Sequence, residues 1–312
     1  MRVQERSGRQ LQIRANGYEA TIATVGATLR QLQHNERDLI VPFDADELRP
    51  HSRGATLAPW PNRIANGAYT FNGSEYQLPL SEPARNNAIH GLVSWVDFQE
   101  RVVVADRIVL TTIIAPMPGY PFRVEVEVEY TIDASGLTQT VTGRNLGADP
   151  APWGTAPHPY LKAGTATPAP GAGAVDEWIL RLPASEVLTV DERLLPVAVE
   201  SIDAHPAWDF REPRKIGTTF LDYAFTGLTR DSDLATVEVR TTDGSGVGIA
   251  FDEGLPWVQI HTADNPNKPA SHRAGLAVEP MTCPPDAFNS GTDLIIIEPG
   301  EEHAASWRIF TL

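Results

Sequence analysis

Residues 122–133 alternate strictly between apolar and polar side chains, and this pattern limits the fold more than any other feature of the sequence. The segment reads FRVEVEVEYTID, with an apolar residue at every second position. A period of two places successive side chains on opposite faces of a β-strand, whereas an amphipathic helix has a period of about 3.6. One face of this strand is therefore expected in the core. The turn-forming run DASG, which begins at Asp133, predicts a β-hairpin over residues 122–145.

The same alternation returns toward the C-terminus. Apolar residues at every second position precede and follow the turn-forming run DGSG at 243–246, and residues 307–311 alternate again. No segment has the spacing of a long amphipathic helix. We therefore predict an all-β fold, a large antiparallel sandwich. A length of 312 residues suggests about two domains, but sandwiches of this size are often one unit, so we expect residues 1–312 to form a single domain.

The run AGTATPAPGAGA at 163–174 contains no bulky apolar residue. Such a segment has little to bury and is either an interdomain linker or a long surface loop. The polar candidates described below lie on both sides of it and make chemical sense only together. This favours the surface loop.

Charge and cysteine content exclude several classes of protein. Lys and Arg total 25 against 40 Asp and Glu, a formal net charge of −15, which argues against nucleic acid and anionic membranes as partners. Cys283 is the single cysteine, so neither an intramolecular disulfide nor a Cys-ligated zinc site is expected. The first residues show neither a signal-peptide pattern nor a long apolar run. We expect a soluble, cytoplasmic protein.

Two histidines stand in unusual local sequence. His158 lies between Pro157 and Pro159, which restrict the backbone and hold the imidazole in one place. His90 precedes Gly91, whose missing side chain permits a tight turn or the close approach of a ligand. Structural interpretations also exist: an inert residue on a Pro-rich loop for His158, and a turn-capping cluster for His90.

Glu279 follows the small and apolar run AGLAV and precedes Pro280. If this run is a strand, Gly275 and Ala277 share the face of Glu279 and leave room for a ring beside the carboxylate. Pro280 is expected to stop the hydrogen-bonded ladder and hold Glu279 extended at the strand end. A solvated glutamate on an edge strand is the alternative.

Three further residues are candidates for ligand binding. Asp222 lies within FLDYAF, so its carboxylate needs hydrogen bonds from a structural donor or from a ligand hydroxyl. Arg63 has no acidic neighbour within several residues, which leaves a surface position or a ligand contact. Trp257, two residues before Gln259, is favoured as the ring on which a sugar stacks, although most tryptophans of a sandwich belong to its core.

Five segments together resemble the aldose 1-epimerase (mutarotase) family, in the family's order. The strongest is NRIANGAYTFNGSEYQLPLSEPARNNAIHG at 62–91, which is similar to the family's Asn-Arg-Ile, Gly, Gly, Tyr-x-Leu, Asn and His-Gly series. The others resemble the family's second histidine motif, aspartate motif, glutamine strand and glutamate motif: PHPYL at 157–161, FLDYAF at 220–225, WVQIHT at 257–262 and LAVEPMTCPPDAFN at 276–289.

This resemblance implies a β-supersandwich of the galactose mutarotase type, with a sugar held in a cleft on one sheet and no cofactor. It also implies roles. His158 would protonate the ring oxygen of a pyranose and Glu279 would remove the proton of the C1 hydroxyl, with the roles exchanged when the ring closes. An imidazole titrating near neutrality and a partly desolvated carboxyl suit these tasks. The residues implied to hold the sugar hydroxyls are Arg63, His90, Asp222 and Gln259.

Some positions depart from the best-known galactose mutarotase pattern. Leu92 follows Gly91 where a second glycine is common, and prolines flank His158 where Asn and Ser are common. The sequence looks more like a divergent bacterial branch, which is similar in this respect to proteins that act on less ordinary aldoses, sulfonated ones among them. A monomer or a homodimer is expected.

Three other functions remain open. A hexose-6-phosphate epimerase would need extra cationic side chains near C6, and the available ones are Arg53, Arg85, Arg211, Arg214 and Lys215. A carbohydrate-binding protein without turnover is the second, although binding alone requires no acid and base together. A metal site could use His90, His158, Asp222 and Glu279, but their spacing is not the short ligand spacing of zinc sites, and we expect no metal.

Overall fold

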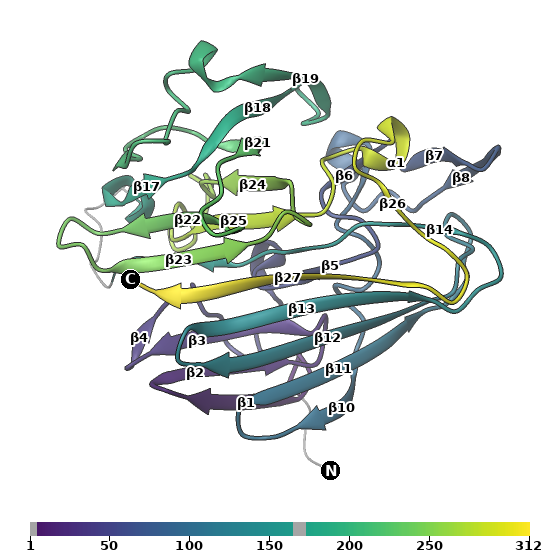
Figure 1. The fold of residues 1–312 in the computed structure, drawn as a ribbon, viewed down its shortest axis with the longest axis horizontal. Helices are drawn as coiled ribbons and strands as arrows, with labels where there is room; N and C mark the ends of the chain where they lie inside the picture. The colour runs from purple at the N-terminus through teal and green to yellow at the C-terminus, as the bar shows by residue number, and fades with distance from the viewer. Residues whose placement is uncertain (1–4, 165–172) are drawn as a thin grey trace.

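The computed structural model describes residues 5–164 and 173–312. Nearly half of these residues lie in strands, which pair antiparallel, and the one α-helix among them is the short α1 (Ala287–Ser290) (Figure 1). This confirms the predicted all-β fold. Residues 165–172 of the predicted loop lie outside the described residues. At its edges Ala163 is buried, and a 3-10 turn begins at Ala174.

A nine-stranded sheet forms the largest layer of the molecule. Its strands, in spatial order, are β10 (Gln99–Val103), β11 (Arg107–Ile114), β12 (Val124–Asp133), β13 (Gly136–Asn145), β27 (Glu302–Thr311), β23 (Gly246–Phe251), β22 (Ala235–Arg240), β17 (Ile179–Arg181) and β20 (Arg214–Lys215). The hairpin predicted over 122–145 is β12 paired with β13, from Val124 opposite Asn145 to Asp133 opposite Gly136. Along β12 the apolar side chains are buried and the glutamates are partly exposed, as the alternation predicts.

A six-stranded sheet carries most of the candidate functional residues. Its order is β16 (Tyr160–Leu161), β25 (Leu276–Met281), β24 (Trp257–His261), β21 (Asp222–Leu228), β18 (Ala184–Val190) and β19 (Pro196–Ser201). The register places Gln259 opposite Glu279 and Asp222 opposite His261. The polar residues of three neighbouring strands therefore meet in the middle of one sheet.

The expectation that Pro280 ends the strand is wrong. Strand β25 continues through Pro280, which lies opposite Val258, to Met281 opposite Trp257. Glu279 is therefore an interior residue of a buried strand rather than its last member. The backbone on both sides of the carboxylate is fixed by the sheet.

Smaller sheets complete the molecule. A four-stranded sheet contains β1 (Gln10–Ala15), β2 (Tyr18–Ala23), β3 (Thr28–His34) and β4 (Arg37–Asp38). Four two-stranded pairs are β5 (Thr56–Leu57) with β15 (Ala156–Pro157), β6 (Arg63–Ala65) with β9 (Asn87–Ile89), β7 (Ala68–Phe71) with β8 (Ser74–Gln77), and β14 (Ala151–Trp153) with β26 (Ile295–Ile297). Short 3-10 turns occur at Pro50–Ser52, Pro83–Arg85, Ala174–Glu177 and Ile202–Ala204.

Large aromatic side chains fill the core between the nine-stranded and four-stranded sheets and satisfy their polar atoms there. Trp307 Nε1 donates a hydrogen bond to Oε1 of Gln139 at 3.1 Å, and the Tyr130 hydroxyl donates to the carbonyl of Ala27 at 2.7 Å. Both rings are buried. Such pairing removes the penalty of burying a lone polar atom.

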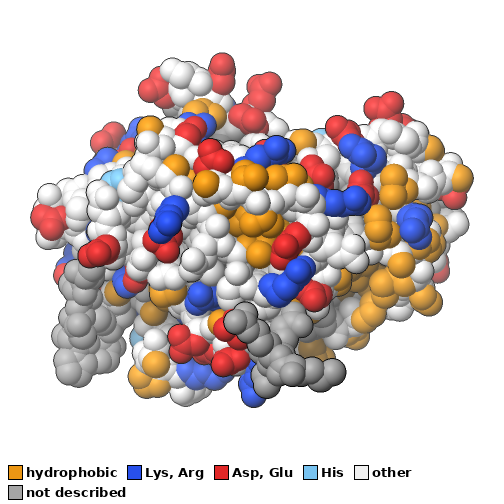
Figure 2. Space-filling model, turned by 90° about the horizontal axis from the view of Figure 1, so that it is seen from below, with side chains coloured by type: hydrophobic (Ala, Val, Ile, Leu, Met, Phe, Trp, Pro, Cys, Tyr) orange, Lys and Arg blue, Asp and Glu red, His pale blue; other side chains and the backbone are white. Residues whose placement is uncertain are grey.

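The surface mixes charges of both signs. On the face seen in Figure 2, acidic and basic side chains are interspersed among apolar ones. Among the described residues, no helix has the length and apolar character needed to span a membrane.

Gly91 is a position where the backbone excludes a side chain. Its φ is +71°, in the left-handed region, and it lies directly against Ala58. A Cβ atom on Gly91 would come within 2.0 Å of the Ala58 carbonyl oxygen. The missing side chain thus permits close approach of the protein's own backbone, and this packing fixes the loop that begins at His90.

We expect Gly91→Ala to lower the free energy of unfolding by more than about 2 kcal/mol, because it combines an unfavourable φ with a clash against backbone. Gly73→Ala is the matched control: Gly73 has a φ of +78°, but a Cβ atom on it would meet no other atom within 4 Å. The control should lose about 1 kcal/mol, from the φ alone. Urea denaturation of both variants measures the difference, and equal losses would show that the contact with Ala58 contributes nothing.

Candidate active site

A cavity of about 260 Å³ opens over the six-stranded sheet. Of the seven residues predicted to act on a ligand, six line it: Arg63, His90, His158, Asp222, Gln259 and Glu279. They come from segments far apart in the sequence, and the sheet register together with the 62–91 segment brings them to one place. The cavity wall is formed largely by polar side chains.

The closest pair in the cavity is His158 and Glu279. Nε2 of His158 lies 3.4 Å from Oε1 of Glu279, and the two residues are only 5% and 2% exposed. The His158 backbone is held on both sides, because its N–H donates to Ala55 O at 3.1 Å and its carbonyl accepts from Gly54 N at 2.7 Å. Its ring stacks on Tyr160 with a centroid separation of 5.3 Å. An imidazole and a carboxyl are therefore fixed in mutual reach.

Burial moves the pKa values of this pair in opposite directions. Desolvation raises the pKa of Glu279 well above its ordinary value, and the negative charge of Asp222 adds to the rise while Arg63 opposes it. Desolvation lowers the pKa of His158 well below its ordinary value, with His90 and His261 adding to the fall. The predicted near-neutral titration of His158 is therefore not what its burial favours.

Each member of the pair keeps one polar atom free for a ligand. Within the described residues, Oε2 of Glu279 and Nδ1 of His158 have no hydrogen-bond partner. Buried polar atoms are nearly always paired, so such atoms mark a site of strain, catalysis or ligand binding. Glu279 can accept a hydroxyl proton through Oε2.

A hydrogen-bonded chain of side chains crosses the cavity floor. Nδ2 of Asn62 donates to Oε1 of Gln259 at 3.2 Å, and Nε2 of Gln259 donates to Oδ1 of Asp222 at 2.8 Å. This chain fixes the amide of Gln259 and one oxygen of Asp222. Asp222 thereby receives the structural donor that the sequence required, and its carboxylate still lines the cavity.

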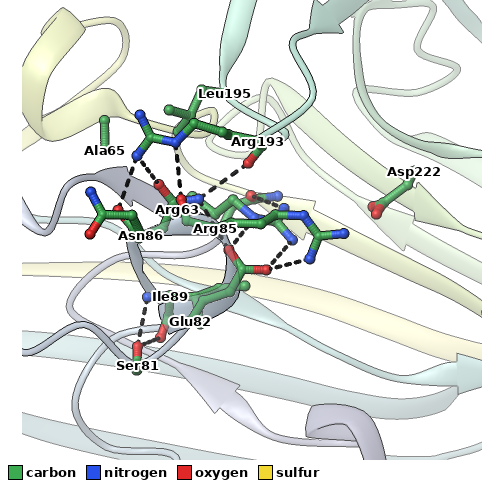
Figure 3. Close-up of polar contacts among 12 residues, drawn as sticks. Arg63, Ala65, Ser81, Glu82, Arg85, Asn86, Ile89, Arg193, Leu195 and Asp222 are labelled. Carbon is green, nitrogen blue, oxygen red and sulfur yellow. Dashed lines mark hydrogen bonds and ion pairs between the residues drawn. The ribbon is translucent and has the colours of Figure 1, made fainter.

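Arg63 has an acidic partner after all, although not a sequence neighbour. Glu82 accepts from its Nε at 2.9 Å and from its Nη2 at 3.0 Å, a bidentate pair (Figure 3). Burial acts to raise the pKa of Glu82, but the hydrogen bonds and charge of Arg63, with Asn87 and Arg85, outweigh it and hold the pKa below its ordinary value. The pair orients Arg63 at the cavity edge.

The tip of the β18–β19 hairpin closes on the same region. Arg193 donates from Nε to the Arg85 carbonyl at 3.0 Å, and from Nη2 to Asn66 Oδ1 at 2.9 Å and to the Asn86 carbonyl at 3.0 Å. Figure 3 shows Arg193 beside Arg85 and Asn86, with Asp222 set apart from them. The hairpin thus braces the loop that carries Glu82 against the six-stranded sheet.

His90 packs edge-on against the catalytic histidine candidate. Its ring centroid lies 5.1 Å from that of His158, and its φ is +63°. Burial lowers its pKa, with the charge of Arg63 adding to the fall and that of Glu82 opposing it. The lowered pKa favours the neutral imidazole of His90, which lies against His158. Among the described residues, Nδ1 of His90 has no hydrogen-bond partner.

The structure adds residues that the sequence reasoning missed: His51, Tyr160 and His261 also line the cavity. Two of them carried a signal. Tyr160 lies two positions after His158, and His261 two positions after Gln259, so the period of two places each on the face of a predicted site residue. His51 has a left-handed φ of +49° in a 3-10 turn, which no sequence pattern indicates.

Trp257 does not line the cavity, contrary to its prediction as the stacking ring. It shares a strand face with Gln259, but it is 4% exposed and packs with Leu57, Leu188 and Met281. Its Nε1 donates to Oδ2 of Asp293 at 2.7 Å. Trp257 is therefore a buried residue on the cavity-facing side of the sheet, covered by its neighbours.

Two other features considered from the sequence are a metal site and Cys283. Within residues 5–164 and 173–312, no three His, Cys, Asp or Glu side chains group closely enough to hold a metal ion. Cys283 is buried, and burial raises the pKa of its thiol to about 12. A neutral thiol of this kind is a small apolar side chain.

Comparison with known proteins identifies related sequences over nearly the whole chain. The aldose 1-epimerase family model matches residues 9–309. The Escherichia coli (strain K12) protein YihR is 36% identical over 305 residues, covering 97% of this chain and 94% of that protein. Galactose mutarotase from Mus musculus is 28% identical over 336 residues, covering 97% of this chain and 94% of the mouse protein.

Solved structures share the fold. An aldose epimerase homologue from C. elegans superposes with a TM-score of 0.82 at 18% identity, covering 97% of this chain and 98% of that one. Galactose 1-epimerase from Lactobacillus acidophilus NCFM gives a TM-score of 0.78 at 18% identity, covering 96% and 92%. These likenesses confirm the predicted galactose mutarotase-like β-supersandwich.

The raised pKa of Glu279 makes a prediction about stability. The unfolded chain releases the Glu279 proton at lower pH than the folded chain does. Between the two pKa values the folded chain therefore binds more protons, and the free energy of unfolding falls as pH rises. Glu279→Gln removes the effect. Its Tm should match the parent near about pH 4 and exceed it by a few degrees near about pH 8.

Thermal unfolding at both pH values measures this, with Glu298→Gln as the control because Glu298 is exposed. The control should differ from the parent by the same amount at both pH values. A Tm gap for Glu279→Gln that stays constant or shrinks with rising pH would contradict the burial argument.

Proposed function

Because the chain belongs to the aldose 1-epimerase family, we propose that it interconverts the α and β anomers of a free aldose, with His158 and Glu279 as acid and base. The observation that carries this proposal is the 3.4 Å separation of these two groups inside a buried cavity. Mutarotase-type chemistry needs one proton donor and one proton acceptor at adjacent atoms of the sugar. The pair supplies both.

The reaction leaves the number of protons on the pair unchanged. Opening the ring breaks the bond between C1 and the ring oxygen, while that oxygen gains a proton from His158 and the C1 hydroxyl loses one to Glu279. Rotation about the C1–C2 bond exposes the other aldehyde face. On closure Glu279 returns its proton to the C1 oxygen and His158 recovers the other. The pair therefore carries one proton throughout, and its titration is a property of both groups.

The opposed pKa shifts favour a proton on Glu279 and a neutral His158 before a sugar binds. A bound sugar changes this balance. A C1 hydroxyl that donates to Oε2 of Glu279 stabilises the carboxylate form, and a carboxylate 3.4 Å away stabilises the imidazolium. Substrate binding thus favours the proton arrangement that ring opening requires.

The neighbouring side chains suit the sugar hydroxyls. Arg63 offers guanidinium donors that Glu82 holds in place, and Asp222 and Gln259 form a fixed acceptor and donor pair beside Glu279. His90 completes the wall. Fixed partners of this kind keep a ring oriented while its bonds change.

A carbohydrate-binding protein without turnover is the alternative class. Such a protein gains nothing from burying an ionisable pair at 3.4 Å, because desolvation of each group lowers stability. The buried pair therefore favours the enzyme. The proposed site residues lie in segments from residue 63 to residue 279, so our proposal treats residues 1–312 as one domain. We further propose that this domain works in the cytoplasm as a monomer or a homodimer.

The cationic side chains considered for a phosphorylated sugar have different surroundings. Arg85 pairs with Glu82, Arg211 with Asp203 and Asp209, and Lys215 with Glu177, while Arg214 donates to the carbonyls of Asp209 and Ala207. None of these four lines the cavity. Arg53 is different, because it is buried and has no carboxylate partner among the described residues.

We expect Glu279→Gln and His158→Asn each to slow enzymatic anomer exchange by about 10²- to 10⁴-fold, because each removes one proton-transfer partner. Saturation-transfer NMR at neutral pH measures the exchange, with glucose, galactose, a hexose 6-phosphate and a 6-deoxy-6-sulfo sugar as substrates. The double variant should be little slower than the worse single one, because the two residues act as a unit.

Trp257→Phe is a matched control for this experiment, because it changes a buried aromatic residue of the same sheet that does not line the cavity. Exchange lost in both catalytic variants but kept in the control would support the proposal. Sugar binding that survives in all forms, with no exchange above the spontaneous rate in the parent, would assign the chain to the binding class.

The pH profile tests the role of Asp222. Its negative charge raises the pKa of Glu279, so Asp222→Asn should lower that pKa and move the alkaline limb of kcat/KM toward lower pH. Asp106→Asn, at an exposed position, is the control and should leave the limb in place. An alkaline limb that moves upward, or not at all, in Asp222→Asn would show that the limb does not report this pair.

A further inference from the structure

A smaller cavity of about 80 Å³ adjoins the catalytic one. The two share three wall residues, His51, Tyr160 and His261. The smaller cavity is also lined by Arg53 and by the polar side chains of Asn265 and Ser271. A ligand in the main cavity can therefore extend a substituent past Tyr160 into this space.

Arg53 is a buried cation without a carboxylate partner. It is 7% exposed, and among the described residues the only hydrogen bond of its side chain runs from Nη1 to the Pro42 carbonyl at 3.1 Å. Its Nε has no partner, and its guanidinium lies 5.4 Å from the centroid of the Tyr160 ring. Burying a charge without a counter-charge is unfavourable. The contrast with Arg63, which Glu82 neutralises, indicates that Arg53 can take an anionic ligand as its partner.

The charged groups around the small cavity also favour an anionic ligand. Burial lowers the pKa of His51, and the positive charges of Lys268 and Arg53 lower it further. Asp264 also lines this space, and Arg273 holds both of its oxygens, at 2.9 and 3.1 Å, while pairing with Asp176 as well. Arg53 and Lys268 therefore bring positive charge to this space although the whole chain is acidic, while the charge of Glu47 acts on Arg53 without forming an ion pair with it.

We propose that the small cavity binds an anionic group, a phosphate or a sulfonate, carried on the exocyclic C6 carbon of the sugar, with Arg53 as its counter-ion. This inference rests on the proposed mutarotase function. In a pyranose, C6 is attached to C5, which is bonded to the ring oxygen. The C6 substituent therefore leaves the ring on the side that His158 serves.

The arrangement around Tyr160 matches this connectivity. The Tyr160 ring stacks on His158 at 5.3 Å and also contacts the Arg53 guanidinium at 5.4 Å. An aldose whose ring oxygen faces His158 thus directs its C6 group toward the neighbouring cation. The planar guanidinium offers paired N–H donors, which suit two oxygens of a tetrahedral anion.

The experiment compares kcat/KM for glucose, glucose 6-phosphate and 6-deoxy-6-sulfoglucose in the parent, in Arg53→Gln and in Arg53→Lys. In the parent, at least one anionic sugar should exceed glucose by roughly 10- to 100-fold, the value of a charge-assisted hydrogen bond. Arg53→Gln should abolish most of this ratio. Arg53→Lys should keep part of it, because the amine retains the charge without the fork of donors.

Arg211→Gln is the matched control, because this arginine is already paired with Asp203 and Asp209 and should leave the ratio unchanged. The better of the two anionic sugars identifies the anion. An equal rate for all three sugars in the parent, or a ratio that Arg53→Gln leaves intact, overturns the inference while the mutarotase function stands. Failure to accelerate any of the three sugars in the parent would instead count against the mutarotase function itself. If Arg53→Gln does not fold, the parent panel and Arg53→Lys still decide.

Discussion

The site depends on holding an imidazole and a carboxyl together out of water. His158 and Glu279 lie 3.4 Å apart at almost complete burial, and each ionised form loses hydration there. Such a pair is stable only if the backbone around it cannot relax. Strand β25 fixes Glu279 from within the six-stranded sheet, and hydrogen bonds to Ala55 and Gly54 fix His158. The rest of the architecture supports this constraint.

The other polar groups of the cavity are held by partners that lie far away in sequence. Glu82 orients Arg63, and Asn62 and Asp222 fix the amide of Gln259. Among the described residues, the large nine-stranded sheet contributes no side chain to the cavity lining. Its buried apolar face instead contributes folding free energy that offsets the cost of burying polar groups at the site. The two sheets therefore divide the work, one providing stability and the other the polar site.

Sequence reasoning succeeded where the determining interactions are local. The alternation of residues 122–133 predicts its strand because the period of two is a property of the backbone itself. It failed where packing decides: Trp257 has the correct strand face but is covered by neighbours, and Glu82 reaches Arg63 across 19 positions. The position of His51 depends on an unusual φ, which leaves no periodic trace.

Net charge is another quantity that tertiary structure redistributes. A total of −15 weighs against an anionic substrate only if the charge is spread evenly, and two of the carboxylates near the site are paired with arginines. Glu82 is held by Arg63, and Asp264 by Arg273. Arg53 alone among these arginines lacks a carboxylate partner in the described residues. Potential at a binding site is set by the charges left uncompensated there, so an acidic chain can present a cationic subsite to its substrate.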